Sequence, residues 1–285
     1  MPEELSPGHE PSRDKPENLP HPLARSQPMT PVERLKRVLL SLPDLALRTG
    51  WLRDFLKSSS EHDSATVLNA LCEDNERADP AAREAILAVA LLFASLGECD
   101  LVDQLRAQAD ARHLLSLSRL LRRAPLPAVH DRPARELPVP DYGTGRELTV
   151  GERKSLARSP NRRAFDKLLT DPHPLVIRQL LENPRLTEDD VVRMTARRPA
   201  RLEVLEAIAQ HGRWLSRPRV RLSMLFNPGS PPAITMPLLA VCTRNELSEV
   251  LHHSESSPVL RSAAHELLER LPPLRASESP GPTLQ

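Results

Sequence analysis

The sequence contains one partial zinc-hydrolase motif, near its C-terminal end, that could in principle support metal-assisted hydrolysis. His265-Glu266 begins the pattern H-E-x-x-H, in which two histidines one helical turn apart hold zinc and the glutamate acts as a general base. Glu269 replaces the second histidine, so a metal at this position would lack a ligand. We therefore interpret this segment as one face of a solvated helix.

The other candidate motifs also fall short of a known chemistry. The adjacent rings of His252 and His253 would point about 100° apart on a helix, so both cannot easily reach one metal. Gly143 and Gly145 lack the strand and the third glycine of a dinucleotide-binding turn, and the sequence has no P-loop. We predict a protein that is not an enzyme and that has no catalytic residue, no metal and no cofactor.

Arginine is concentrated in one part of the chain, and this regional charge is the best functional signal. Between Gly151 and Arg221 there are 16 Arg or Lys and nine Asp or Glu, a surplus of seven in a chain whose formal net charge is +1. Guanidinium groups form paired hydrogen bonds with carboxylates and phosphates, and each neutralised phosphate also releases counterions. The predicted partner-binding residues are Arg193, Arg197, Arg198, Arg213, Trp214, Arg217, Arg219 and Arg221.

Trp214, flanked by these arginines, has two interpretations. Its ring could stack on a nucleic-acid base. Alternatively it fills a gap between helices while the arginines stay solvated, some paired with Glu182, Glu188 or Asp189. The packing interpretation is favoured, because one aromatic side chain is a poor stacking platform.

The composition indicates which elements must position these residues. Aromatic residues make up 2% of the chain, so Leu, Ala and Val supply most of the core, and these favour helices over sheet. Many of the 30 prolines fall between apolar runs, where they separate short helices. We predict an all-α protein with almost no sheet.

The N-terminal half is predicted to be a small helical bundle or array. Thr30 can cap a helix that starts at Pro31, and further helices are expected near 44–57, 64–73, 100–108 and 111–123. Residues 80–96 are apolar nearly all round, as in a helix enclosed by its neighbours. Trp51 and Phe55, four residues apart, pack in the core or, less favoured, form an exposed anchor for a partner. The predicted divisions are a disordered arm (1–29), an N-terminal helical domain (30–123), a Pro-rich linker (124–147), a helical repeat domain (148–272) and a disordered tail (273–285).

The second half contains an internal repeat. Residues 174–184 (PLVIRQLLENP) match residues 218–228 (PRVRLSMLFNP) at a constant offset of 44, so that Asn183-Pro184 aligns with Asn227-Pro228. Weaker copies occur at 155–160 and 196–199. We expect Asn183 to end its helix in the left-handed conformation and Thr187 to cap the next helix, with Asp190 three residues on. Short amphipathic helices must stack to bury their apolar sides, which predicts a short, curved α-solenoid.

This pattern resembles the leucine-rich repeat variant, to which HEAT-like helical repeats are closely related. The resemblance covers about residues 151–271, and it implies an α-helical superhelix that serves as a binding surface. Some proteins of that family carry a cysteine-rich iron-sulfur segment before the repeats. No such cysteine group stands in this sequence, so the resemblance implies no cluster for this chain.

The expected location is cytoplasmic, with no membrane association. The three cysteines, Cys72, Cys99 and Cys242, are far apart, as is typical of free thiols in a reducing compartment. The N-terminus has no secretory-signal pattern, and the longest uncharged apolar stretch, residues 85–97, is shorter than the roughly 20 residues of a spanning helix. The excess of Arg over Lys, together with that of Ala, Leu and Pro, is typical of a GC-rich bacterial genome.

Two functions are compatible with these features. The favoured one is a non-catalytic interaction or scaffold module that presents a concave, Arg-rich face to an acidic segment of a partner protein. The alternative is a nucleic-acid-binding protein that resembles the HEAT-like DNA glycosylases, which lay duplex DNA along such a surface. Catalysis would then need a carboxylate in the groove. Asp166 and Asp171 lie in the right region of the chain, but the sequence does not fix their positions, and neither is predicted to be catalytic.

Overall fold

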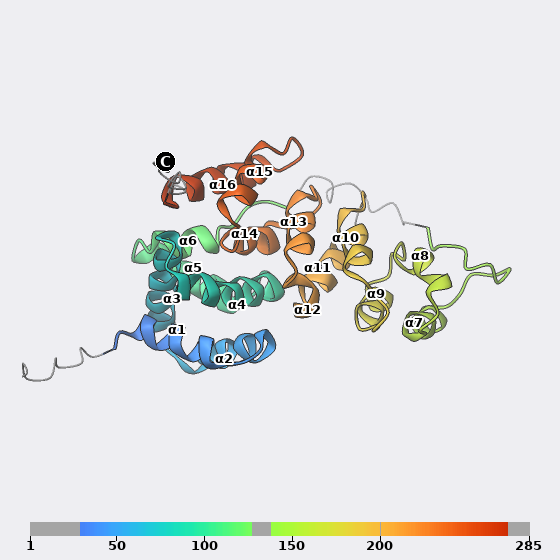
Figure 1. Ribbon diagram of the computed structural model, residues 1–285, viewed down its shortest axis with the longest axis horizontal. Helices are drawn as coiled ribbons and strands as arrows, with labels where there is room; N and C mark the ends of the chain where they lie inside the picture. Colours follow the sequence, from blue (N-terminus) through green and yellow to red (C-terminus); the bar gives the residue numbers. More distant parts are fainter. Residues whose placement is uncertain (1–28, 127–137, 200, 273–285) are drawn as a thin grey trace, which may run out of the picture.

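The computed structural model describes residues 29–126, 138–199 and 201–272, and within these ranges the chain is all-helical without a strand (Figure 1). The all-α prediction is therefore confirmed. Residues 1–28 and 273–285, which contain the arm and tail predicted to be disordered, lie outside the described residues. So does 127–137, the middle of the predicted linker.

The N-terminal half consists of helices close to the predicted ones. At the first of these, the Thr30 hydroxyl accepts from the Glu33 backbone N–H at 3.3 Å, as expected of a capping residue, and the Glu33 carboxylate also accepts from the Thr30 backbone N–H. Only the last helix is shorter than its predicted range, 111–123. The helices are α1 (Pro31–Ser41), α2 (Leu45–Ser58), α3 (Glu61–Glu76), α4 (Pro80–Leu96), α5 (Asp100–Ala111) and α6 (Leu115–Leu120).

Helix α4 is the centre of the molecule. It packs against α1, α2 and α3 on one side and against α11 and α14 of the second half on the other (Figure 1). Accordingly Ile86 and Phe93 belong to the N-terminal core, whereas Leu91 and Ala94 belong to the core of the second half. Because it has neighbours on both sides, most of the helix beyond its first turns is buried, which explains its apolar sequence. The rings of Trp51 and Phe55 stack 5.4 Å apart and pack, half-buried, against the N-terminal core.

Short helices of the second half lie in two rows. Helices α7, α9 and α11 follow one another in the first row, and α10, α13 and α15 in the second (Figure 1). The curvature of a solenoid stays a prediction. The elements are α7 (Val150–Arg158), the 3-10 helix η2 (Arg162–Ala164), α8 (Phe165–Leu168), α9 (Pro174–Leu181), α10 (Glu188–Ala196), α11 (Leu202–Ala209), α12 (Gly212–Leu215), α13 (Pro218–Phe226), α14 (Pro232–Leu239), α15 (Arg244–His252) and α16 (Pro258–Arg270).

The asparagines of the sequence repeat hold neighbouring helices together within each row. The buried side-chain amide of Asn183, after α9, donates to the carbonyls of Ala157 (2.7 Å) and Ser159 (2.9 Å) at the end of α7. The amide of Asn227, after α13, donates to Thr195 O (2.6 Å) and Arg197 O (3.1 Å) at the end of α10. The offset of 44 residues thus has a structural counterpart.

The expected left-handed conformation of Asn183 is wrong. Among the described residues, positive φ angles outside glycine occur only at Ala78 and His113. Asn183 ends its helix through its side chain, whose carbonyl oxygen accepts from the Arg185 backbone N–H at 2.9 Å while the amide reaches α7. The carbonyls at a helix end have no partner within their own helix, so a buried amide is a favourable ligand for them.

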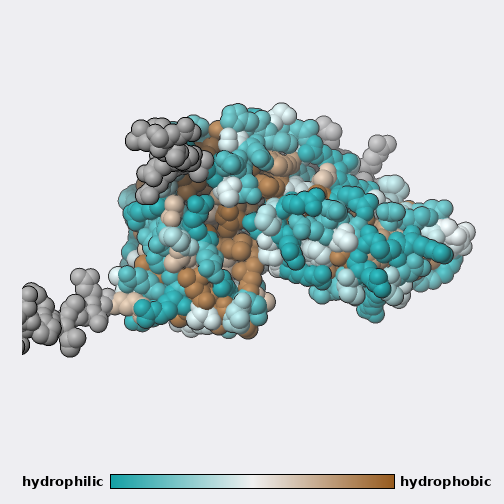
Figure 2. All heavy atoms as spheres, in the orientation of Figure 1, coloured by the Kyte–Doolittle hydropathy of each residue, from teal (hydrophilic) through white to brown (hydrophobic). Residues whose placement is uncertain are grey.

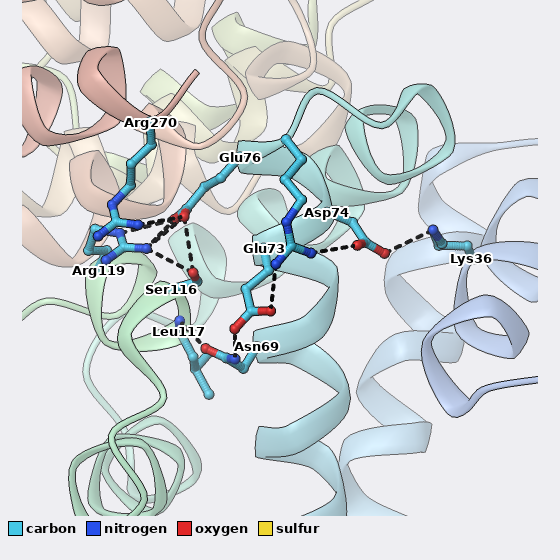
Figure 3. Close-up of polar contacts among 10 residues, drawn as sticks. Lys36, Asn69, Glu73, Asp74, Glu76, Ser116, Leu117, Arg119 and Arg270 are labelled. Atoms are coloured by element: carbon cyan, nitrogen blue, oxygen red, sulfur yellow. Dashed lines mark hydrogen bonds and ion pairs between the residues drawn. The ribbon is translucent and has the colours of Figure 1, made fainter. Parts of the chain in front are cut away.

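The two halves also meet through ion pairs at one end of α3. Glu76 accepts hydrogen bonds from Arg119 (2.6 Å) and Ser116 (3.1 Å) of α6, and Arg270 of α16 lies 3.8 Å from the same carboxylate (Figure 3). Asn75 donates to the carbonyl of Ala240 at 3.0 Å. These contacts, together with the shared helix α4, join the N-terminal helices to the C-terminal end of the chain.

Candidate partner-binding surface

A buried ion pair lies near the start of the repeat half. Arg153 of α7 donates to both carboxylate oxygens of Asp171 at 2.7 Å, with 5% and 0% of these side chains exposed. The hydroxyl of Tyr142 donates to Asp171 at 2.8 Å, and the His173 backbone N–H donates to it at 2.9 Å. Burial and the Asp171 carboxylate both raise the pKa of Tyr142. Asp171 is therefore a structural carboxylate that is closed to a substrate, and the described end of the predicted linker is anchored by Tyr142.

The residues of the partial zinc motif are used in ordinary contacts. Glu266 forms an ion pair with Arg122 at 2.6 Å, and this hydrogen-bonded guanidinium lowers the pKa of the glutamate. His253 stacks on Phe226 at 4.6 Å, whereas the ring of His252 contacts the Ser248 carbonyl of its own helix at 2.7 Å. Across the described ranges, no group of three or more His, Cys, Asp and Glu side chains could hold a metal ion.

Trp214 is a core residue, so the prediction that it contacts a partner is wrong. Only 3% of its surface is exposed, and its indole N–H donates to the Leu181 carbonyl at the end of α9 over 2.8 Å. Arg213 lies over one ring face, 4.5 Å from the centroid. A base cannot stack on this ring, because protein atoms already surround it. The packing interpretation of the sequence was the right one.

Three of the predicted arginines are engaged with the protein backbone. Arg197 donates to the Thr170 carbonyl, and Arg198 donates to the Phe226 carbonyl at 3.0 Å and pairs with Glu255. Arg221 donates to the Ser216 carbonyl at 2.5 Å, and burial lowers the pKa of its guanidinium. These side chains connect separate parts of the chain, so part of the donor capacity of each guanidinium is already used within the protein.

Two further predicted residues, Arg193 and Arg219, form ion pairs. Arg193 pairs with buried Asp190 at 2.5 Å and with exposed Asp166 at 3.4 Å. Arg219 pairs with Asp189 at 2.6 Å. Each charge is balanced within the chain, although the guanidinium groups stay accessible.

Arg213 and Arg217 are the predicted residues that remain exposed and form no ion pair with any described residue. Four other arginines of the repeat half share these two properties, and the sequence analysis did not single them out. We call this set the arginine edge: Arg158, Arg163, Arg178, Arg185, Arg213 and Arg217.

Hydrogen bonds between consecutive loops bring the arginine edge together. Asn183 links the end of α9 to the end of α7, and the neighbouring carbonyl of Arg185 accepts from Arg162 at 2.6 Å. The bond from Trp214 to Leu181 places α12 against the end of α9. The loops after α7, α9 and α11 therefore lie side by side, and each contributes arginines.

The positions of these arginines follow partly from helix electrostatics. Arg158 and Arg178 lie in the last turns of α7 and α9, where the partial negative charge of the helix end favours a cation. The acids Glu188, Asp189 and Asp190 lie in the first turn of α10, where the opposite preference holds. The preference of basic residues for the last turn of a helix and of acidic residues for the first turn could have indicated part of the arginine edge from the sequence. A count of charges over the whole region does not contain this information.

Comparison with known proteins gave no relative: no family model, no curated protein and no solved structure matches this chain. The resemblance to the leucine-rich repeat variant thus stays a prediction. No helix in the described part of the chain is both long and apolar enough to cross a membrane.

Proposed function

We propose that the protein is a non-catalytic interaction module whose arginine edge binds an acidic segment of a partner protein. The observation that carries this proposal is the set of exposed guanidinium groups that form no ion pair with a described residue and lie on α7, α9 and the segments that follow α7, α9 and α11. Two features support membership of the helical-repeat proteins of the leucine-rich repeat variant or HEAT-like kind. They are the two rows of short helices and the asparagine clamps, by which we mean the equivalent hydrogen bonds from Asn183 and Asn227 to the end of a neighbouring helix.

Carboxylates beside the edge favour a protein over a nucleic acid as the partner. Glu182 has 70% of its side chain exposed and Asp189 has 71%, and both belong to the loop and first turn between α9 and α10. Asp189 is balanced by Arg219, but the Glu182 carboxylate would repel a continuous phosphate backbone, whereas a protein segment can place its acids opposite the arginines alone. The burial of Trp214 also removes the aromatic ring on which a base could stack.

The test compares two labelled probes with the full-length chain at low and physiological salt. One probe is a peptide of alternating Glu and Ser, and the other is a random DNA duplex, each followed by fluorescence anisotropy. In the edge variant, Arg163, Arg185, Arg213 and Arg217 are changed to Glu. The matched control changes four exposed arginines of the N-terminal half to Glu, namely Arg34, Arg37, Arg53 and Arg83.

We expect the peptide to bind the wild type and the control but not the edge variant. Binding should weaken as salt rises, since exposed charges are screened. If the duplex binds through the edge and the peptide does not, the nucleic-acid alternative replaces this proposal. If neither probe binds, or if both variants lose peptide binding equally, the arginine edge is not the binding surface.

A further inference from the structure

An apolar groove lies where the two halves diverge from their shared helix. It is bounded by the end of α4, by α11, by the start of α14 and by the segment after α6. Leu126 has 51% of its surface exposed, and Leu96, Leu202, Pro232 and Ala233 are partly exposed, whereas Ala94 and Ile234 form a buried floor. The charged residues Glu98, Arg123 and Glu206 also line the groove.

The polarity of the groove changes along α11. Leu202, Glu206 and Gln210 follow one another at intervals of four residues, so they share one face of the helix, and all three line the groove. The face is apolar at its N-terminal end and polar at its C-terminal end. Over eight residues of helix these ends are about 12 Å apart.

The polar end of the groove meets the arginine edge. Gln210 accepts a hydrogen bond from Arg178 at 3.2 Å, and Arg213 follows three residues later on α12. Neither arginine forms an ion pair with a described residue. A segment lying in the groove therefore reaches two uncompensated guanidinium groups as it leaves the apolar end.

The groove lies at a junction that is more hydrophobic than the surface of the repeat half. Hydrophilic side chains cover most of the visible face over α7 to α10 (Figure 2). Hydrophobic ones gather in the hollow between the two halves, where α4 and α14 lie. Helix α4 packs closely on α14 but more sparsely on α11, which leaves apolar lining exposed on this side of the junction.

We propose that the groove and the arginine edge bind one linear segment of a partner protein, apolar at one end and acidic at the other. Charge complementarity fixes the acidic end at Arg178 and Arg213, and burial of apolar surface fixes the other end near Leu126 and Ala233. An extended chain rises about 3.3–3.6 Å per residue, so roughly three or four residues separate the two parts. This inference rests on the proposed function, whose acidic segment it describes further.

Three labelled peptides and the full-length chain test the inference. The parent peptide has two leucines, three serines and four glutamates in that order. The second peptide has serine in place of both leucines, and the third has glutamine in place of every glutamate. The groove variant combines Leu126→Ser with Ala233→Gln, and its control is Leu115→Ser, which alters an equally exposed leucine that does not line this groove.

We expect the parent peptide to bind about tenfold more tightly than the peptide without leucines, as follows from burying part of two apolar side chains. The groove variant should bind both of these peptides with the weaker affinity, whereas the control should keep the difference. Thermal melts followed by circular dichroism establish that both variants are folded.

Equal affinity for the peptides with and without leucines would contradict the inference that the groove binds an apolar end of the segment, while leaving the proposed function in place. Equal affinity for the parent and the glutamine peptide overturns the proposed function, because the arginine edge then contributes nothing. Loss of the difference in the Leu115→Ser control as well would assign the apolar contact to another surface.

Discussion

Arginine serves opposite purposes in two regions of the repeat half. Around Asp171, the guanidinium of Arg153 is buried and donates through Nη1 to both carboxylate oxygens, one of which also accepts from Tyr142. On the arginine edge, at the end of the same helix, Arg158 is exposed and has no ion-pair partner among the described residues. The first site holds the fold together and the second is free to recognise a partner, so the role of an arginine depends on what surrounds it.

The largest expected effect comes from breaking the buried pair. Arg153→Ala leaves the carboxylate of Asp171 buried without its cation, which should destabilise the fold by about 3–5 kcal/mol. Urea unfolding followed by circular dichroism measures this loss. The control is Arg158→Ala on the same helix, with an expected change within about 0.5 kcal/mol. Similar losses of unfolding free energy in the two variants would contradict the distinction between a structural Arg153 and an Arg158 that is free to bind a partner.

The asparagine clamps should show the next largest effect. Asn227→Ala removes the partner of two carbonyls and of the Gly229 backbone N–H, at a cost of about 1–3 kcal/mol. Asn183→Ala should behave alike, because its contacts are equivalent. Exposed Asn245 on α15 is the control, and its change to Ala should be nearly neutral. A neutral Asn227→Ala would mean that the repeated residue is not a stabilising clamp.

Acid should weaken the ion pairs that Asp190 of α10 forms with Arg162 and Arg193. Burial alone would raise the pKa of Asp190, but hydrogen bonds from Thr187, Arg193 and Arg162 outweigh it and lower the pKa below its ordinary value. A lowered folded-state pKa adds stability above the unfolded-state pKa of about 4, and this contribution is lost as pH falls through the folded-state value.

Asp190→Asn should therefore cost about 1–2 kcal/mol at neutral pH, through the loss of charged hydrogen bonds. The difference from the wild type should shrink as the pH falls below about 4. Urea midpoints at several pH values measure it. A difference that stays constant with pH would show that the charge of Asp190 is not what stabilises the site.

The smallest effect on stability is expected at the arginine edge itself. Arg217→Ser removes an exposed guanidinium that forms no ion pair with a described residue, so the free energy of unfolding should change by less than about 0.5 kcal/mol. Thermal unfolding measures this. A larger loss would place Arg217 among the structural arginines, and the edge would then be smaller than proposed.

The sequence by itself determined the local features of this protein. The helix ends at Thr30, Thr187 and Thr243 are set by a hydroxyl and a carboxylate three residues apart, and such signals act within one helical turn. The apolar circumference of residues 80–96 likewise predicted a buried central helix. The repeat at offset 44 was visible because the same short motif is used twice.

Only the tertiary structure decided which arginines are available. Arg198 donates to the Phe226 carbonyl and pairs with Glu255, and the indole of Trp214 donates to the Leu181 carbonyl. In each case the two partners are far apart in the sequence. Such contacts form only when helices that are separated in the chain pack side by side, and no pattern within one helix encodes them. The same reason explains why the groove beside α11 could not be foreseen: its walls come from four separate parts of the chain.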